Sequence, residues 1–157
     1  MYPHAKPQTL VQIAGLSSRP GPPGSSLLVM IDAQREYTRG LLPLLGIDAA
    51  MEEGARGTEL AVRIRTTRRG ELVIAGFATH MCVSATARSV LEHGFRSTAV
   101  AAATRALPHP FGAGVTPAGI IQSGTLAALS DRFAVVIKDT LALGREWGQA
   151  VRVARST

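Results

Sequence analysis

One stretch of the chain, residues 71–93, restricts the possible fold more than any other. Residues 71–75 form an apolar run of strand length, Gly76 begins a short turn, and residues 81–93 have the pattern of a helix that ends at Gly94. A buried strand that leads straight into a helix is typical of parallel sheets, because the chain must cross one face of the sheet to reach the next strand. The stretch therefore predicts an α/β domain.

Strands and helices alternate along much of the remaining chain. Apolar runs at residues 27–31, 98–102 and 133–137 predict three further strands, and residues 60–69 and 117–130 predict helices between strands. Such alternation favours parallel pairing with right-handed crossovers. We therefore expect a doubly wound parallel sheet, a three-layer sandwich of the Rossmann type with helices on both faces. Gly70 is the expected C-cap of the helix that precedes the second strand.

The composition fits a single folded domain. The chain has 157 residues, of which 46% are hydrophobic and 18% charged, and this is enough apolar material for a core. Residues 1–26 contain five of the nine prolines and are expected to form an extended N-terminal segment. The folded domain is predicted to span residues 27–157.

The single cysteine and the short apolar runs indicate the cellular compartment of the protein. One cysteine excludes an intrachain disulfide and a zinc site built from several cysteines. The apolar runs are too short to cross a bilayer, and the N-terminus lacks the apolar core of a secretory signal. We therefore expect a cytoplasmic protein without a membrane partner.

The net charge of +6 raises the question of a nucleic-acid partner, since fifteen of the seventeen basic residues are arginine. The basic residues are scattered except in residues 63–69, where a cluster of arginines is expected to form a solvated helix face. Aromatic residues make up only 4% of the chain. A stacking platform for single strands is therefore missing. We therefore expect no specific nucleic-acid partner. The alternative, a basic nucleic-acid-binding domain, is supported by the net charge alone.

Two residues are candidates for chemistry. Cys82 lies in the first turn of the predicted helix, where unpaired backbone N–H groups favour a thiolate and can hold a developing oxyanion. Asp32 closes the first predicted strand, at the edge where open α/β sheets collect functional groups. The alternatives are that Cys82 is a small buried apolar residue and that Asp32 is a loop or helix-cap carboxylate.

Two motifs give the chain a family resemblance. Residues 31–37 and residues 73–87 resemble the corresponding segments of the isochorismatase-like cysteine hydrolases, the superfamily that includes nicotinamidases. The similarity continues through residues 104–136, so that most of residues 27–141 is covered. The resemblance implies the fold expected above and a hydrolase that acts on a small amide or a related small-molecule substrate.

The resemblance also implies roles for individual residues. Cys82 would be the nucleophile, Asp32 would accept the thiol proton, and the backbone N–H groups of Ala78 and Cys82 would form the oxyanion hole. Gln34 and Tyr37 would line the substrate pocket. Arg105 is left outside the predicted site, because an arginine in a polar loop is usually solvated.

Further expectations follow from the same resemblance. The peptide between Phe77 and Ala78 would be cis and would aim the Ala78 N–H into the site. No cofactor and no metal are implied, and the family's tendency to self-associate predicts a homo-oligomer. The histidines lack the spacing of metal ligands; they are His4, His80, His93 and His109. His80 is expected to face the pocket or to pack beside it rather than to act as a base.

The chain departs from the family in one respect. The resemblance implies a third catalytic residue, a lysine between the Asp and Cys motifs, but residues 33–81 contain no lysine, and the chain has only Lys6 and Lys138. This interval is also short, so that one strand and the lysine loop are predicted to be missing. The chain is then either a degenerate paralogue that serves as a binding or assembly subunit, or a shortened version of a complete hydrolase.

Overall fold

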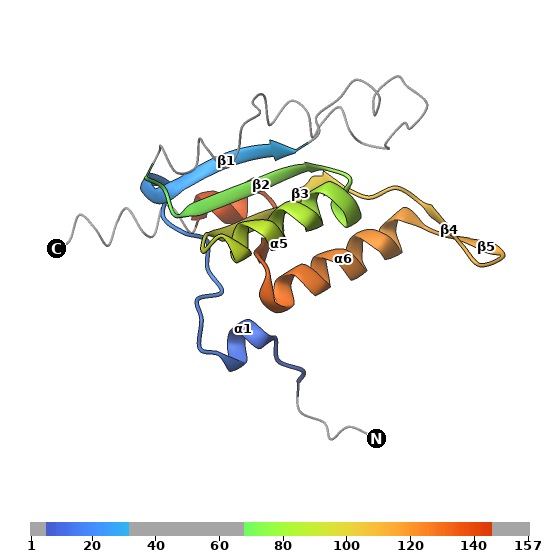
Figure 1. Ribbon diagram of the computed structural model, residues 1–157, viewed down its shortest axis with the longest axis horizontal. Helices are drawn as coiled ribbons and strands as arrows, with labels where there is room; N and C mark the ends of the chain where they lie inside the picture. The colour runs from blue at the N-terminus through green and yellow to red at the C-terminus, as the bar shows by residue number, and fades with distance from the viewer. Residues whose placement is uncertain (1–5, 32–67, 146–157) are drawn as a thin grey trace.

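The computed structural model describes residues 6–31 and 68–145, which form a parallel sheet flanked by helices (Figure 1). The strands of this sheet lie in the order β1-β2-β3-β6, and each neighbouring pair is parallel. The strands are β1 (Ser26–Ile31), β2 (Glu71–Phe77), β3 (Arg96–Arg105) and β6 (Val135–Ile137). The sequence-based prediction of these four strands and of their parallel pairing is confirmed.

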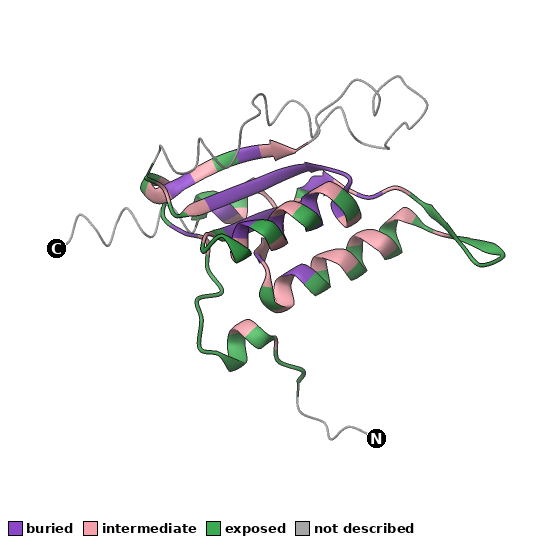
Figure 2. Cartoon of the chain, viewed as in Figure 1, coloured by how far each residue is buried: buried purple, intermediate pink, exposed green. Residues whose placement is uncertain are grey.

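Helices cover both faces of the sheet, as predicted. On one face lie α5 (Ser84–Glu92) and α6 (Ala118–Arg132), and residues 140–145 are helical on the other. Side chains of β2 alternate between two cores, because successive residues of a strand point to opposite faces. Leu72 and Ile74 pack under α5 and α6, whereas Val73 and Ala75 pack with Leu143. Strand β2 is therefore the central, fully covered strand (Figure 2).

The end of α5 shows why the chain turns where the sequence predicts. Gly94 has a φ of 81°, in the left-handed region that favours glycine. Its N–H donates to the Leu91 carbonyl at 3.0 Å, and the Phe95 N–H donates to the Val90 carbonyl at 3.0 Å. This is the Schellman arrangement of a helix C-terminus. Gly70, in contrast, lacks a left-handed φ, which occurs instead at Arg68 with a φ of 53°.

The N-terminal segment is less extended than its prolines indicated. It contains one helical turn, α1 (Leu10–Ile13), which Thr9 and Gln12 begin with a capping box. The Leu10 N–H also donates to the Asp131 carboxylate at 2.9 Å, so α1 is docked on the end of α6. The Thr-x-x-Gln pattern at residues 9–12 is a local helix-start signal that outweighs the neighbouring prolines.

Arg96, at the start of β3, binds residues 17–19 of the N-terminal segment to the sheet. Its guanidinium donates to the carbonyls of Ser17 at 3.4 Å and Arg19 at 3.1 Å, and it forms a 2.8 Å ion pair with Glu71. Burial raises the pKa of the Glu71 carboxyl above its usual range, and the Arg96 charge offsets part of that rise. A short 3₁₀ turn, η1 (Pro23–Ser25), then leads into β1.

A β-hairpin occupies part of the region expected to be a proline-rich loop. Strands β4 (His109–Phe111) and β5 (Gly114–Thr116) pair antiparallel through a two-residue connection. Gly112, the first residue of this connection, has a φ of 60°, which matches the tight hairpin turns that need glycine. The hairpin projects beyond the sheet and leads directly into α6 (Figure 1). None of the helices in the described ranges is long and apolar enough to span a membrane.

Candidate functional site

The turn between β2 and α5 carries Cys82. The Phe77–Ala78 peptide is cis, as predicted. The next residues form a π-helical turn, η2 (Thr79–Val83), in which the Val83 N–H donates to the Ala78 carbonyl at 3.3 Å. The prediction of an α-helix from residue 81 is therefore wrong at its start, because the α-helix begins only at Ser84. Single π-turns of this kind are frequent at functional sites.

The thiol of Cys82 is free and half-buried. The next residue, Val83, is fully buried in the core under α5, whereas the preceding residue, Met81, is 60% exposed. Cys82 thus lies between the core and the surface, and it is not among the residues of either apolar cluster.

Gly76, near the end of β2, allows the end of β1 to lie very close to β2 just before this turn. Ile31 is its partner across the strand pair, and a Cβ added to Gly76 would lie 2.0 Å from the Ile31 carbonyl oxygen. The φ of Gly76 is 130°, which also favours glycine. Asp32 follows Ile31 directly in the sequence. Asp32, Gln34 and Tyr37 lie outside the described residues, so their contacts with Cys82 remain predictions.

Strand β3 has a large bulge beside the end of β2. Ile74 pairs with Ala99, but Gly76 pairs with Thr104, so that β3 uses five residues where β2 uses two. Arg105 pairs with Phe77 at the end of this register. Its guanidinium turns back and donates to three carbonyls of its own strand, those of residues 101, 102 and 104, at 2.7 to 3.5 Å.

A hydrogen-bond chain links the cysteine turn to α6 and β3. The Thr79 hydroxyl donates to the Gln122 side-chain carbonyl at 2.6 Å, and the Gln122 amide donates to the Thr104 hydroxyl at 2.9 Å and to the Thr104 carbonyl at 3.1 Å. Thr79 and Thr104 are fully buried. No sequence pattern indicates this network, although Gln122 is the only amide side chain among the uncharged residues 106–130.

Replacement of Gln122 is expected to weaken the fold at this turn. Gln122→Leu leaves two buried hydroxyls without their present partner, which costs about 2–6 kcal/mol of unfolding free energy, because each such group loses about 1–3 kcal/mol. Urea unfolding followed by circular dichroism measures this cost. Ser123→Ala, at the exposed neighbouring position of the same helix, is the control and should cost little. Equal costs for the two variants would contradict a structural role of the network.

His80 has an unusual environment beside Cys82. Its Nδ1 atom is buried and has no hydrogen-bond partner among the described residues, and its ring lies edge-on to that of His109, with 6.2 Å between centroids. Burial lowers the pKa of His80, and the nearby His109 lowers it further. His80 is therefore neutral near pH 7 and packs beside the site. Within residues 6–31 and 68–145, no three His, Cys, Asp or Glu side chains are grouped as metal ligands.

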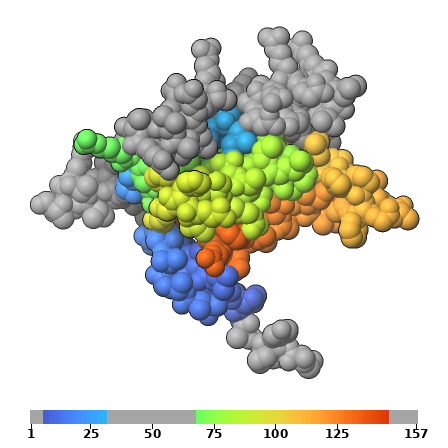
Figure 3. All heavy atoms as spheres, in the orientation of Figure 1, coloured from blue at the N-terminus to red at the C-terminus, as the bar shows by residue number. Residues whose placement is uncertain are grey.

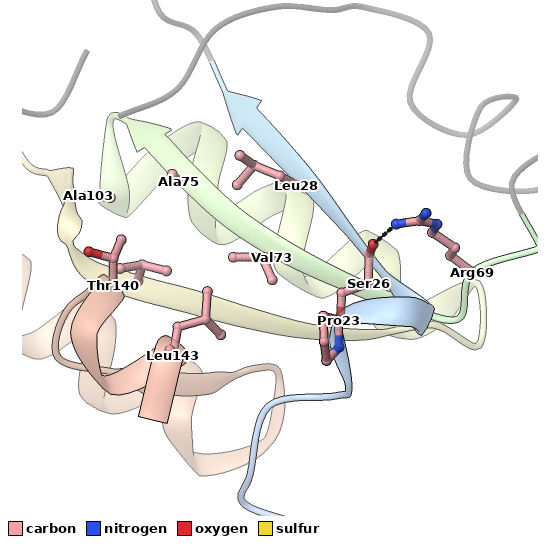
Figure 4. Close-up of a pocket in the computed structure, with 11 residues that line it drawn as sticks. Pro23, Ser26, Leu28, Arg69, Val73, Ala75, Ala103, Thr140 and Leu143 are labelled. Atoms are coloured by element: carbon pink, nitrogen blue, oxygen red, sulfur yellow. Dashed lines mark hydrogen bonds between the residues drawn. The ribbon is translucent and has the colours of Figure 1, made fainter. Parts of the chain in front are cut away.

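A concave region lies on the face of the sheet that packs with Leu143, opposite to the face under α5 and α6 (Figure 4). It has a volume of about 500 Å³, and most of its described lining is apolar, including Leu28, Val73 and Leu143. Arg69 closes one end, where its guanidinium donates to the Ser26 carbonyl. The described lining contains no cysteine, histidine or carboxylate, so this part of the chain offers no group for acid–base or nucleophilic chemistry in the region.

Known proteins are similar to this chain in sequence and in fold. Residues 50–138 match the family described as the isochorismatase domain. The chain is 31% identical over 132 residues to the isochorismatase-like protein asqB of Emericella nidulans, and the match covers 83% of this chain and 81% of asqB. An isochorismatase structure from Pseudomonas putida is 23% identical with a TM-score of 0.75, covering 85% of this chain and 97% of that one.

A structure of a putative isochorismatase from Burkholderia xenovorans is also similar, with 21% identity, a TM-score of 0.67 and coverage of 87% of this chain and 100% of that one. At these identities the two structures establish the fold, whereas the domain match and the similarity to asqB establish the family. The chain therefore belongs to the isochorismatase family of hydrolases.

Proposed function

We propose that this protein is a cytoplasmic cysteine hydrolase that acts on a small amide or a related substrate through a covalent intermediate on Cys82. One observation carries the proposal: a free, half-buried thiol lies in the turn after β2, and Gly76, near the end of β2, lies against Ile31, the residue just before Asp32. A nucleophile and a carboxylate base at the carboxyl ends of adjacent parallel strands fit acyl transfer.

In the proposed reaction, Asp32 accepts the proton of Cys82 as the sulfur attacks the substrate carbonyl carbon. The backbone N–H groups of Ala78 and Cys82 hold the negative charge that forms on the carbonyl oxygen. The C–N bond then breaks, the amine leaves with the proton from Asp32, and a thioester remains on Cys82. Water attacks this thioester with Asp32 as base, which releases the acid and restores the thiol. Gln34 and Tyr37 would orient the substrate.

The absence of a lysine favours a second candidate, a catalytically impaired member that serves as a binding or assembly subunit. Residues 33–81 contain no lysine to stabilise the developing charge. Two arginines near the turn are already engaged: Arg105 binds carbonyls of its own strand, and Arg88 lies 3.9 Å above the Phe133 ring and contacts Ser84. Neither supplies a free positive charge in place of the lysine.

Alkylation of the single cysteine tests the shared site. We expect Cys82 to react with iodoacetamide faster than a free thiol at neutral pH, and Asp32→Asn to slow this reaction several-fold because the proton acceptor is lost. Mass spectrometry reports one label per chain, since Cys82 is the only cysteine. Glu92→Gln, which removes one exposed carboxylate at the end of α5, is the matched control. An ordinary thiol rate that Asp32→Asn leaves unchanged would return Cys82 to a structural role.

A further inference from the structure

A second concave region lies between the N-terminal segment and the ends of α5 and α6. In the space-filling view, the N-terminal segment packs against these helix ends (Figure 3). We name this region the N-terminal groove; it has a volume of about 570 Å³. Its larger lining side chains are Leu10, Val11, Ile13, Leu16, Leu91 and Arg132. Cys82 lies before the other end of α5, a helix of 9 residues that is roughly 14 Å long, so the groove is separate from the candidate active site.

Hydrogen bonds on both sides of the N-terminal groove fix its outer wall. Before the groove, the Leu10 N–H donates to the Asp131 carboxylate, and after it, Arg96 binds the backbone of residues 17–19. Between these two anchors, Gly15 ends the α1 turn with a φ of 65°. A ligand therefore meets a wall that is already ordered, and its binding does not include the entropic cost of ordering the segment.

Apolar side chains in the groove are strongly exposed. Ile13 is 66% exposed, Leu16 is 64% exposed and Leu10 is 48% exposed. Single exposed apolar residues are common on protein surfaces, but these three line one groove together with Leu91. The volume of the groove also lies within the range of about 300–1,000 Å³ that is typical of small-molecule sites. The groove therefore suits a small ligand with an apolar body.

Arg132 supplies the single charge of the described lining. Its guanidinium is exposed and forms no hydrogen bond, ion pair or ring contact with any described residue. The carboxylate of the neighbouring Asp131 accepts the Leu10 N–H instead. In the concave region that Leu143 lines, by contrast, the guanidinium of Arg69 already donates to a backbone carbonyl. Of these two arginines, Arg132 is the one that is available to pair with a ligand.

The helix ends beside the groove do not cancel the charge of Arg132. The last carbonyls of a helix together carry a partial negative charge of about half an electron. At the end of α5 the carbonyls of Val90 and Leu91 accept N–H groups of the turn that follows, and at the end of α6 the Leu129 carbonyl does the same. Because these carbonyls are paired, their partial charges are partly offset, and the full positive charge of the guanidinium dominates.

We infer that the N-terminal groove binds a free carboxylate with an apolar chain of medium length, of which decanoate is an example. The carboxylate pairs with the Arg132 guanidinium, whose fork of N–H donors matches the two carboxylate oxygens. The chain lies against Ile13, Leu16 and Leu91 and removes them from water. Because the apolar lining is concave, the ligand is a free molecule and not a flat membrane surface. This site does not depend on the function proposed for Cys82.

Isothermal titration calorimetry with decanoate tests this site. We expect the wild-type chain to bind decanoate with a dissociation constant below about 1 mM. Decyltrimethylammonium has the same chain and the opposite charge, and it should bind at least about tenfold more weakly. Arg132→Gln should weaken the binding of decanoate at least about tenfold, because hydrogen bonds between charged groups are lost. Arg145→Gln, at an exposed arginine outside the groove, lowers the net charge equally and should leave the binding unchanged.

A second pair of variants locates the ligand. Leu16→Asp places a negative charge in the wall of the groove and should also weaken the binding of decanoate at least about tenfold, whereas Leu28→Asp, in the region that Leu143 lines, should not. Both leucines are more than half exposed, so circular dichroism should show the wild-type fold for each variant. The inference is overturned if decanoate does not bind below about 1 mM, or if Arg132→Gln weakens binding no more than Arg145→Gln. Loss of binding in Leu28→Asp but not in Leu16→Asp would place the ligand in the other region and would also overturn it.

Discussion

Gly76→Ala is expected to destabilise the protein by about 3–5 kcal/mol, a large part of the 5–15 kcal/mol that stabilises a typical domain. The added methyl group would lie 2.0 Å from the Ile31 carbonyl oxygen, and the backbone of β1 cannot move aside without breaking its pairing with β2. The φ of 130° adds conformational strain. Urea unfolding of the variant and of the wild type measures the difference.

Gly94→Ala is the matched control for this experiment. Gly94 also has a positive φ, 81°, but a Cβ there meets nothing within 4 Å. Its replacement should therefore cost only about 1 kcal/mol, the conformational part of the effect. The excess cost at Gly76 then measures the close contact between the ends of β1 and β2. Equal costs at the two glycines would contradict the close approach of Gly76 to the Ile31 backbone.

The second large effect concerns catalysis without the lysine. We expect the chain to hydrolyse small amides such as nicotinamide poorly or not at all, because the loss of one positive group beside the oxyanion typically costs a hundredfold or more in rate. A variant in which a lysine-bearing segment is inserted into the short interval between Asp32 and Cys82 should be at least about a hundredfold faster. Turnover of an amide panel by both proteins measures this difference.

Cys82→Ala is the control in both backgrounds and should remove whatever turnover is present. Robust turnover by the unmodified chain that depends on Cys82 would show that another group replaces the lysine. The proposal of an impaired binding or assembly subunit would then fail, while the cysteine mechanism would stand.

The sequence predicted the sheet well because its strands are buried on both faces. Continuous apolar runs such as residues 72–75 lack the alternation of apolar and polar residues that is typical of strands with one exposed face. Gly94 likewise indicates the end of α5, where it adopts a left-handed φ. The start of the helix after β2 was the part of the fold that the sequence did not predict correctly. Whether a turn winds as a π-helix or an α-helix depends on which N–H reaches the Ala78 carbonyl, and this has no signal in residue types.

The site was predictable only in part. The strand–turn–helix pattern placed Cys82 just after a strand, and the family resemblance indicated the cis peptide that precedes it. The contacts that hold the turn came from tertiary structure: Thr79 and Thr104 are 25 residues apart in sequence and meet only through Gln122 on α6. The β3 bulge that brings Thr104 opposite Gly76 is likewise a property of strand pairing, which no local pattern encodes.

Acetylation by p-nitrophenyl acetate tests the central claim, that Cys82 is a nucleophile and not a structural residue. An activated ester is attacked far more readily than an amide and needs less stabilisation of the developing charge, so the missing lysine matters least with this substrate. We expect acid-quenched mass spectrometry to find one acetyl group on Cys82, formed faster in the folded chain than in the urea-unfolded chain and then hydrolysed, so that released nitrophenol exceeds one equivalent. Acetylation no faster in the folded chain, or an acetyl group that is never released, would contradict the account.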